Sequence, residues 1–178
     1  MRRQKQGTFD GLHAPKDIFG GSLLTSHPKI KRPLESKLPT HLVLRAERSA
    51  MRNPKYYLKV NQIVRAACAK HGVKLYEYAN VGNHLHLLLK LQTRRSWAAF
   101  IRELTGRIAQ LTKIKWVHRS FNRIVCGWKK AYRIVREYVE LNRRDADGLA
   151  SRMEKIFLQE LQTRLSQISF PHGLAKLI

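Results

Sequence analysis

Residues 73–91, VKLYEYANVGNHLHLLLKL, decide the fold that this sequence adopts. Polar and apolar residues alternate from Val73 to Ala79, which predicts a β-strand with one buried face. Residues 81–83 form a turn sequence, and the strand after it carries leucines along one face: Leu85, Leu87, Leu89 and Leu91. The two strands are therefore predicted to pair as a hairpin.

The patterns on both sides of this hairpin extend it into one domain. Residues 40–45 are predicted to form a strand, and residues 57–71 a helix capped by Gly72. After the hairpin we predict a helix from Ser96, a strand over 121–128, a helix over 129–142 and a peripheral helix over 149–165. The order strand, helix, strand, strand, helix, strand, helix predicts an α+β fold, a ferredoxin-like antiparallel sheet with helices packed on one face.

The chain divides by composition into three parts. Residues 1–38 contain glycines, prolines and scattered basic residues without a hydrophobic period, so they form a basic arm. Such an arm either follows a phosphate backbone or serves as a solubilising tail, and the sequence leaves both open. Residues 39–148 hold the predicted domain, and residues 149–178 form a C-terminal helical extension.

The charge of the chain points to a polyanionic partner. Lys and Arg number 35 against 12 acidic residues, for a net charge of +23. Nucleic acid is the first candidate, because bound basic side chains release the counterions of phosphates. The sequence has no secretory signal and no apolar run of the roughly 18 to 20 residues that span a bilayer, so we expect a cytoplasmic protein without membrane contact. Cys68 and Cys126 lie far apart and predict no structural zinc site.

The most specific local feature is the His-x-His pair in the second strand of the hairpin. Side chains alternate along a strand, so His84 and His86 share the face opposite Leu85 and Leu87. Their Cα atoms lie about 6 to 7 Å apart, a spacing that suits two nitrogens on one divalent cation. Taken by itself, the motif also fits two ordinary polar residues on an exposed sheet face that bind no metal.

A second feature lies in the predicted helix over residues 129–142. Tyr138 and Asn142 are four residues apart and therefore neighbours on one helical face. The amide oxygen of Asn142 suits a hard cation such as Mg²⁺ or Mn²⁺. The phenol of Tyr138 is either a nucleophile or, as for most such residues, a packing group.

Together these features resemble the single-tyrosine transposases of the IS200/IS605 group, in particular the REP-associated tyrosine transposases. The HUH motif of that family (His, bulky hydrophobe, His) matches residues 82–89, and its later stretches match residues 119–125 and 138–142. Residues 39–46 are similar to its first strand. Many relatives continue after the asparagine with Pro and a Val-Arg/Lys-Ala-Gly run, which residues 143–148 of this chain replace.

The resemblance implies an enzyme that cuts and rejoins single-stranded hairpin DNA. A divalent metal, Mg²⁺ or Mn²⁺, held by His84, His86 and Asn142 would assist attack by Tyr138 and leave a 5′-phosphotyrosine. Relatives occur as a monomer or a homodimer. The family would make residues 39–148 the catalytic domain.

Basic residues around the predicted strands are the DNA-binding candidates: Arg32, Arg45, Arg94, Arg95, Arg119, Arg123, Lys129 and Lys130. Each is otherwise a solvated surface charge. Trp97, Trp116 and Trp128 are candidates for stacking on bases or for core packing. Three other readings stay open, namely a binding module without chemistry, a replication-initiator or relaxase-type nickase, and a domesticated host endonuclease.

Overall fold

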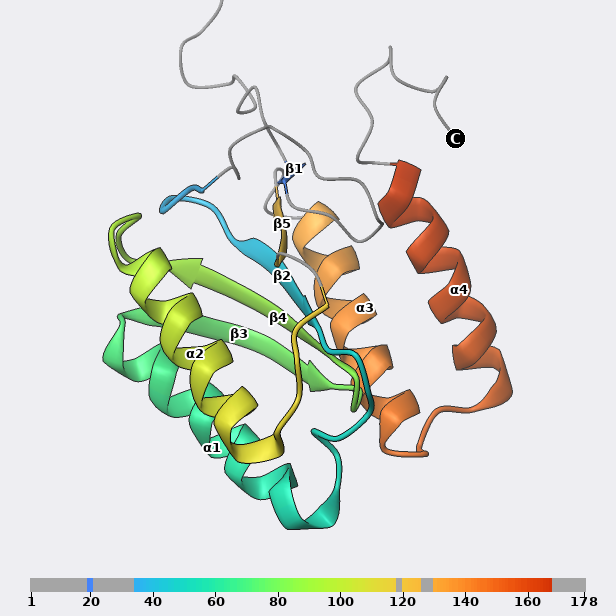
Figure 1. Ribbon diagram of the computed structural model, residues 1–178. Coiled ribbons are helices and arrows are strands. Elements are labelled where there is room, and N and C mark those ends of the chain that lie inside the picture. Colours follow the sequence, from blue (N-terminus) through green and yellow to red (C-terminus); the bar gives the residue numbers. More distant parts are fainter. Residues whose placement is uncertain (1–18, 21–33, 118–119, 126–129, 168–178) are drawn as a thin grey trace, which may run out of the picture.

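The computed structural model describes residues 19–20, 34–117, 120–125 and 130–167 (Figure 1). After a two-residue strand β1 (Phe19–Gly20), the elements follow in this order: β2 (Thr40–Arg45), α1 (Pro54–Lys70), β3 (Val73–Asn80), β4 (His84–Leu91), α2 (Ser96–Thr112), β5 (Phe121–Ile124), α3 (Lys130–Ala146) and α4 (Arg152–Gln167). The order β2-α1-β3-β4-α2-β5 is the predicted ferredoxin-like arrangement.

The strands form one antiparallel sheet in the order β1-β5-β2-β4-β3. Strand β4 pairs with β3 as the predicted hairpin and with β2 on its other side. The central pair therefore joins β2 and β4, which lie far apart in the sequence. The predicted α+β class and its antiparallel sheet are confirmed.

Helices α1 and α2 cover one face of the sheet (Figure 1). The odd-numbered leucines of β4 are fully buried against them, in a cluster that includes Val60 and Val64 of α1 and Phe100 and Leu104 of α2. Asn53 caps the N-terminus of α1, because its side chain accepts a hydrogen bond from the Lys55 amide. This face is the main core.

Helix α3 lies on the opposite face, so the expectation that all helices pack on one face is corrected (Figure 1). Leu88 is fully buried there although it shares the face of His86, and it packs with Ala79 of β3 and with Val135 and Val139 of α3. An apolar residue on the histidine face needs a cover, and the apolar stripe of α3 supplies it. Helix α4 packs against α3, with Leu165 in the same cluster.

Several element boundaries differ from the predicted ones. Strand β5 ends at Ile124 rather than at residue 128, and residues 126–129 lie outside the described residues. Helix α3 continues past Asn142 to Ala146, and Gly148 follows with a φ of 73°, the left-handed conformation common after a helix. Within the basic arm, Phe19 and Gly20 pair with Arg123 and Asn122 of β5, where no regular structure was expected.

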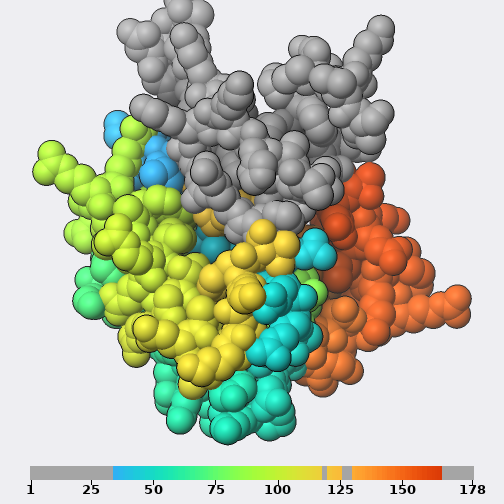
Figure 2. Space-filling view, viewed as in Figure 1, coloured from blue at the N-terminus to red at the C-terminus, as the bar shows by residue number. Residues whose placement is uncertain are grey.

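Two connecting segments meet at one end of the sheet. The Glu47 amide donates to the Lys115 carbonyl, and the Val117 amide donates to the Arg45 carbonyl. Figure 2 shows the segment after β2 (cyan) beside the segment after α2 (yellow) on the surface. In the part of the chain that the structure describes, no helix has the length and apolar character needed to span a bilayer.

Candidate active site

The two histidines of the predicted metal site lie on β4, on the face of the sheet that α3 covers. In the pairing of β4 with β2, His84 lies opposite Arg45 and His86 opposite Val43. The centroids of the two imidazole rings are 4.7 Å apart. His86 is buried, whereas His84 is half-buried. The two rings lie side by side, as the alternation of the strand predicts.

The turn before β4 is held by several hydrogen bonds. The Asn80 side chain accepts from the Gly82 amide and donates to the Met51 carbonyl. The Gly82 carbonyl accepts from the amides of Ala50 and Met51, and the Ala46 amide donates to the Asn83 carbonyl over 2.7 Å. Because this turn immediately precedes His84, these bonds fix the position from which the histidine strand starts.

Tyr138 projects from α3 toward His86. The centroids of their rings are 5.4 Å apart with an interplanar angle of 89°, an edge-to-face contact. Burial raises the pKa of the Tyr138 phenol, while a hydrogen bond with the Asn142 side chain and the charge of Arg123 lower it. Asn142 also donates from Nδ2 to the Tyr138 carbonyl over 2.8 Å. Ring contacts thus join Tyr138 to His86 and His86 to His84, and Asn142 adjoins this group through Tyr138.

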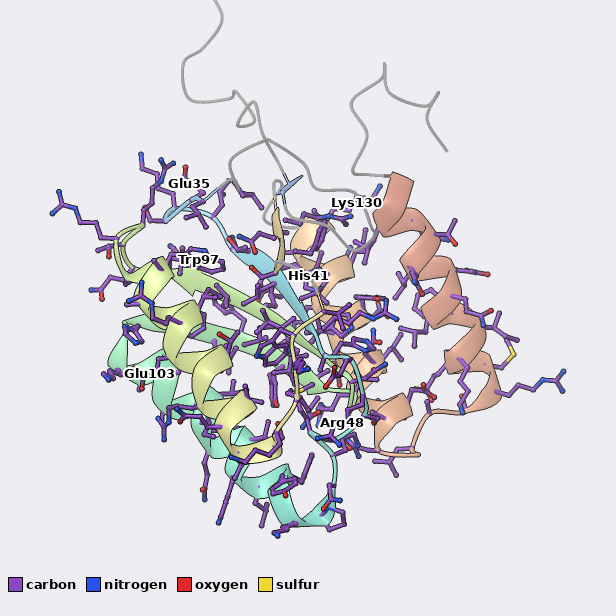
Figure 3. All side chains as sticks on the ribbon, in the orientation of Figure 1. Glu35, His41, Arg48, Trp97, Glu103 and Lys130 are labelled. Carbon is purple, nitrogen blue, oxygen red and sulfur yellow. The ribbon has the colours of Figure 1, made fainter. Side chains whose placement is uncertain are left out.

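The site contains a third histidine that the sequence analysis did not identify. His41 of β2 is buried on the side of the sheet next to α3 (Figure 3). Its Nε2 lies 3.3 Å from Nδ1 of His86, and its ring centroid lies 5.9 Å from that of Tyr138. In the β2 pattern, His41, Val43 and Arg45 alternate onto one face, but only the pairing with β4 shows that this is the face of His86.

The imidazoles of the site are held in the neutral form, which is the metal-binding form. Burial lowers the pKa of His41 to about 3, and the charge of Arg123 acts in the same direction. Burial also lowers the pKa of His86 well below its usual value, with smaller effects from His41 and His84. For His84, burial lowers the pKa first and the Arg45 charge second.

The donor atoms fit a divalent cation. Nδ1 of His84 lies 2.6 Å from Oδ1 of Asn83, which only accepts hydrogen bonds, so Nδ1 carries the proton and Nε2 keeps a lone pair. Nε2 of His86 is buried and has no hydrogen-bond partner among the described residues. Within those residues no three His, Cys, Asp or Glu side chains form a metal-binding group.

Two of the predicted DNA-binding cations lie on the site face. Arg45 is exposed opposite His84, and Arg123 of β5 lies opposite His41 and is mostly buried. Burial lowers the pKa of Arg123 to about 10, and Tyr138 opposes that shift, so the guanidinium stays charged at neutral pH.

The other candidates lie elsewhere. Arg94 and Arg95 come after the end of β4 at Leu91, whereas His84 is at its start. Arg94 forms an ion pair with Glu35 over 3.2 Å. Lys130 is exposed at the start of α3 (Figure 3). Arg32, Arg119 and Lys129 lie outside the described residues, as does Trp128.

The two described tryptophans belong to the core of α1 and α2. Trp97 is buried there, and Trp116 packs against the same cluster while its indole N–H donates to the Thr105 carbonyl. For these two residues, packing is the role that the structure shows.

Comparison with known proteins gives the family of the chain. The chain resembles the solved structure of a REP-associated tyrosine transposase bound to a REP hairpin, with 13% identity and a TM-score of 0.59 over 85% of this chain and 95% of the other. A putative transposase from Deinococcus radiodurans R1 matches with 16% identity and a TM-score of 0.42 over 65% of this chain and 98% of the other. No curated protein matches the sequence. The family model described as "Transposase IS200 like" matches residues 35–137, more than half of the chain, and the chain therefore belongs to the IS200-like transposases.

Proposed function

We propose that this protein cleaves and rejoins single-stranded DNA through a covalent bond to Tyr138, with residues 39–148 as its catalytic domain. The observation that carries the proposal is the edge-to-face contact of Tyr138 with His86, at a centroid distance of 5.4 Å. The two residues come from α3 and β4 and meet beside a charged guanidinium, that of Arg123. This combination suits phosphoryl transfer, because Tyr138 would be the nucleophile, the two histidines would be metal ligands and the Arg123 guanidinium would supply positive charge.

His84, His86 and Asn142 would hold a divalent cation, Mg²⁺ or Mn²⁺. When bound, the cation would polarise an oxygen of the scissile phosphate. The two imidazoles present neutral nitrogens to it, as their lowered pKa values require. Asn142 is a neighbour of Tyr138 on α3, so as a ligand it would hold the cation close to the nucleophile.

Tyr138 would supply the nucleophilic oxygen. Its phenol loses the proton as Oη attacks phosphorus, so an O–P bond to Tyr138 forms and the P–O3′ bond of the DNA breaks. The leaving 3′-oxygen takes up a proton and becomes a free hydroxyl, while the 5′ end stays on the enzyme. Attack of another 3′-hydroxyl on this linkage reverses the step and joins strands. Arg123 lowers the pKa of Tyr138 and favours the phenolate.

Hairpin DNA is the proposed substrate. The net charge of +23 suits a polyanion. The solved relative with the same fold is bound to a REP hairpin. Arg45 and Arg123 lie at the site, and the remaining proposed contacts are Arg32, Arg94, Arg95, Arg119, Lys129 and Lys130.

The test is a covalent-adduct assay on a denaturing gel. Protein is mixed with labelled single-stranded hairpin DNA and Mg²⁺ or Mn²⁺, and we expect a shifted band that EDTA and Tyr138→Phe both remove. Tyr132→Phe, a second tyrosine of α3, is the matched control and should keep the band. A band that persists in Tyr138→Phe would refute the assigned nucleophile.

One observation favours a second candidate, a binding protein of this fold without chemistry. The family match ends at residue 137, just before Tyr138. In that case the same gel shows no adduct with any hairpin, while the DNA still binds tightly and in a salt-sensitive manner.

A further inference from the structure

We propose that His41 is a positioning residue that sets the tautomer of His86, so that Nε2 of His86 keeps its lone pair for the cation. The inference rests on the metal site of the proposed function and adds a residue outside the ligand set. His41 would act on Nδ1 of His86, the ring nitrogen that would not bind the cation. A hydrogen-bond partner of that nitrogen decides which of the two ring nitrogens carries the proton.

The two rings have the geometry of a hydrogen-bonded pair. Nε2 of His41 and Nδ1 of His86 are 3.3 Å apart, and the interplanar angle is 16°. The centroids are 5.5 Å apart and the facing nitrogens 3.3 Å apart, so both nitrogens lie close to the line between the centroids and the rings meet edge to edge in nearly one plane. In this arrangement the N–H of one imidazole points along its plane at the lone pair of the other.

One proton occupies the gap between these two nitrogens. A hydrogen bond between two imidazole nitrogens needs an N–H on one ring and a lone pair on the other, and a neutral imidazole has one of each. Two facing lone pairs would repel, and two facing N–H groups would clash. The bond therefore runs either from Nδ1 of His86 to His41 or from Nε2 of His41 to His86.

The buried surroundings favour His86 as the donor. If His41 donated, the proton of His86 would sit on Nε2, which is buried and has no acceptor among the described residues. If His86 donates from Nδ1, Nε2 is a lone pair ready for a cation. His84 shows the same arrangement, because Asn83 accepts from its Nδ1. Each metal-facing nitrogen is thus prepared by an acceptor on the other side of its ring.

A neutral acceptor also suits the neighbourhood of the nucleophile. The His41 ring lies 5.9 Å from the Tyr138 ring, and both are in the field of Arg123. A carboxylate in the place of His41 would orient His86 equally well, but its charge would raise the pKa of Tyr138. An imidazole orients His86 without adding a negative charge beside the phenol of Tyr138.

The test combines two measurements on full-length protein. In metal-free, ¹⁵N-histidine-labelled wild type, long-range ¹H–¹⁵N spectra should show the proton of His86 on Nδ1. His41→Gln keeps an acceptor, and it should retain that tautomer and bind Mn²⁺ like wild type in a titration followed by electron paramagnetic resonance. His41→Leu removes the acceptor, and it should shift His86 toward the Nε2–H form and weaken Mn²⁺ binding by about 10- to 100-fold. His71→Leu, another histidine that contacts an aromatic ring, is the control and should leave Mn²⁺ binding unchanged.

The outcomes separate this inference from the proposed function. A wild-type His86 with its proton on Nε2 overturns the role of His41, whether or not the leucine variant folds. So does wild-type Mn²⁺ affinity in His41→Leu. A covalent adduct formed alongside either result leaves the proposed function intact. Conversely, the expected spectra and Mn²⁺ affinities without any adduct support His41 and refute the catalytic proposal.

Discussion

Tyr138 lies in surroundings that oppose its own ionisation. Burial beside two neutral imidazoles raises its pKa, and the charge of Arg123 is one of two influences that lower it. The phenol is therefore protonated in the free protein at neutral pH. As the proposed nucleophile, the phenol would depend on positive charge at the site, from Arg123 and from a bound cation.

The first prediction at the residue scale concerns Arg123. Arg123→Gln should raise the pKa of Tyr138, because a nearby positive charge favours the phenolate. It should also slow adduct formation by roughly 10²- to 10³-fold, the usual effect of losing one preorganised group in a site. Titration of ¹³C-labelled tyrosine and adduct gels measure the two effects. Arg136→Gln, which removes a cation of α3 that pairs with Glu77 of β3 over 3.5 Å, should change neither. An unchanged Tyr138 titration in Arg123→Gln would contradict the assignment.

The second residue-scale prediction concerns Glu103, which joins α2 to the end of α1. Its carboxylate accepts from Lys70 and from His71, and these bonds, Lys70 first, lower its pKa from 4.5 to about 2. As the pH falls, the Glu103 carboxylate is therefore protonated at a higher pH in the unfolded chain than in the folded protein. The stability that Glu103 contributes is complete above pH 4.5 and is lost as the pH drops toward 2.

Urea unfolding of wild type and Glu103→Gln measures this contribution. Wild type should be the more stable protein at about pH 7, and the gap between the two midpoints should narrow at about pH 3. A gap of constant size over that range would show that Glu103 does not titrate in this manner.

At the scale of elements, the turn between β3 and β4 sets where the histidine strand begins. Gly82 has a φ of 101°, and a Cβ added there would meet the Oγ of Ser49. Gly82→Ala should therefore lower the unfolding free energy by about 1 to 3 kcal/mol. Adding Ser49→Ala relieves the collision but leaves the backbone strain, so the double variant should recover only part of the loss.

Gly106→Ala is the matched control for that substitution. Gly106 is exposed in α2 and has open space around an added Cβ, so alanine there should raise stability by about 0.5 to 1 kcal/mol. Thermal melts or urea curves check both substitutions. Equal effects at Gly82 and Gly106 would mean that the turn carries no strain.

The elements themselves could largely be predicted from local patterns. Alternation in β3 and β4 and the apolar spacing of α1 and α2 depend only on neighbouring residues, and these elements lie where they were expected. The side of the sheet that α3 covers depends on Leu88, one apolar residue on the histidine face. Leu88 stands between Leu87 and Leu89, which belong to the other face, so the sequence does not show that it needs a separate cover.

The same limit explains what could be predicted of the site. His84 with His86, and Tyr138 with Asn142, are pairs within single elements, so their spacing reveals them. His41 belongs to the site only because Val43 pairs with His86 and His41 with Arg123. Pairing registers between strands far apart in the chain leave no trace in one sequence. His41 therefore looked like an ordinary residue of the first strand.

At the scale of the whole molecule, the excess of 23 positive charges has to be separated from the few cations that touch DNA. A diffuse field attracts DNA from any side, whereas phosphate contacts release counterions one by one. Arg45 and Lys59 allow the two to be distinguished. Both are exposed, but Arg45 lies opposite His84 on the site face and Lys59 lies on α1, which covers the other face.

The last prediction compares the salt dependence of hairpin binding in Arg45→Gln and Lys59→Gln, which change the net charge equally. In wild type, log affinity should fall linearly with log salt, with a slope of about −0.7 for each phosphate neutralised on a single strand. Arg45→Gln should make that slope shallower by about 0.7, the contribution of one phosphate contact, whereas Lys59→Gln should leave it unchanged. Fluorescence anisotropy with a labelled hairpin, in the absence of divalent metal so that no cleavage intervenes, gives both slopes. If the two variants change the slope equally, the DNA does not lie along the face that carries His84, and the proposed position of the scissile phosphate beside Tyr138 loses its support.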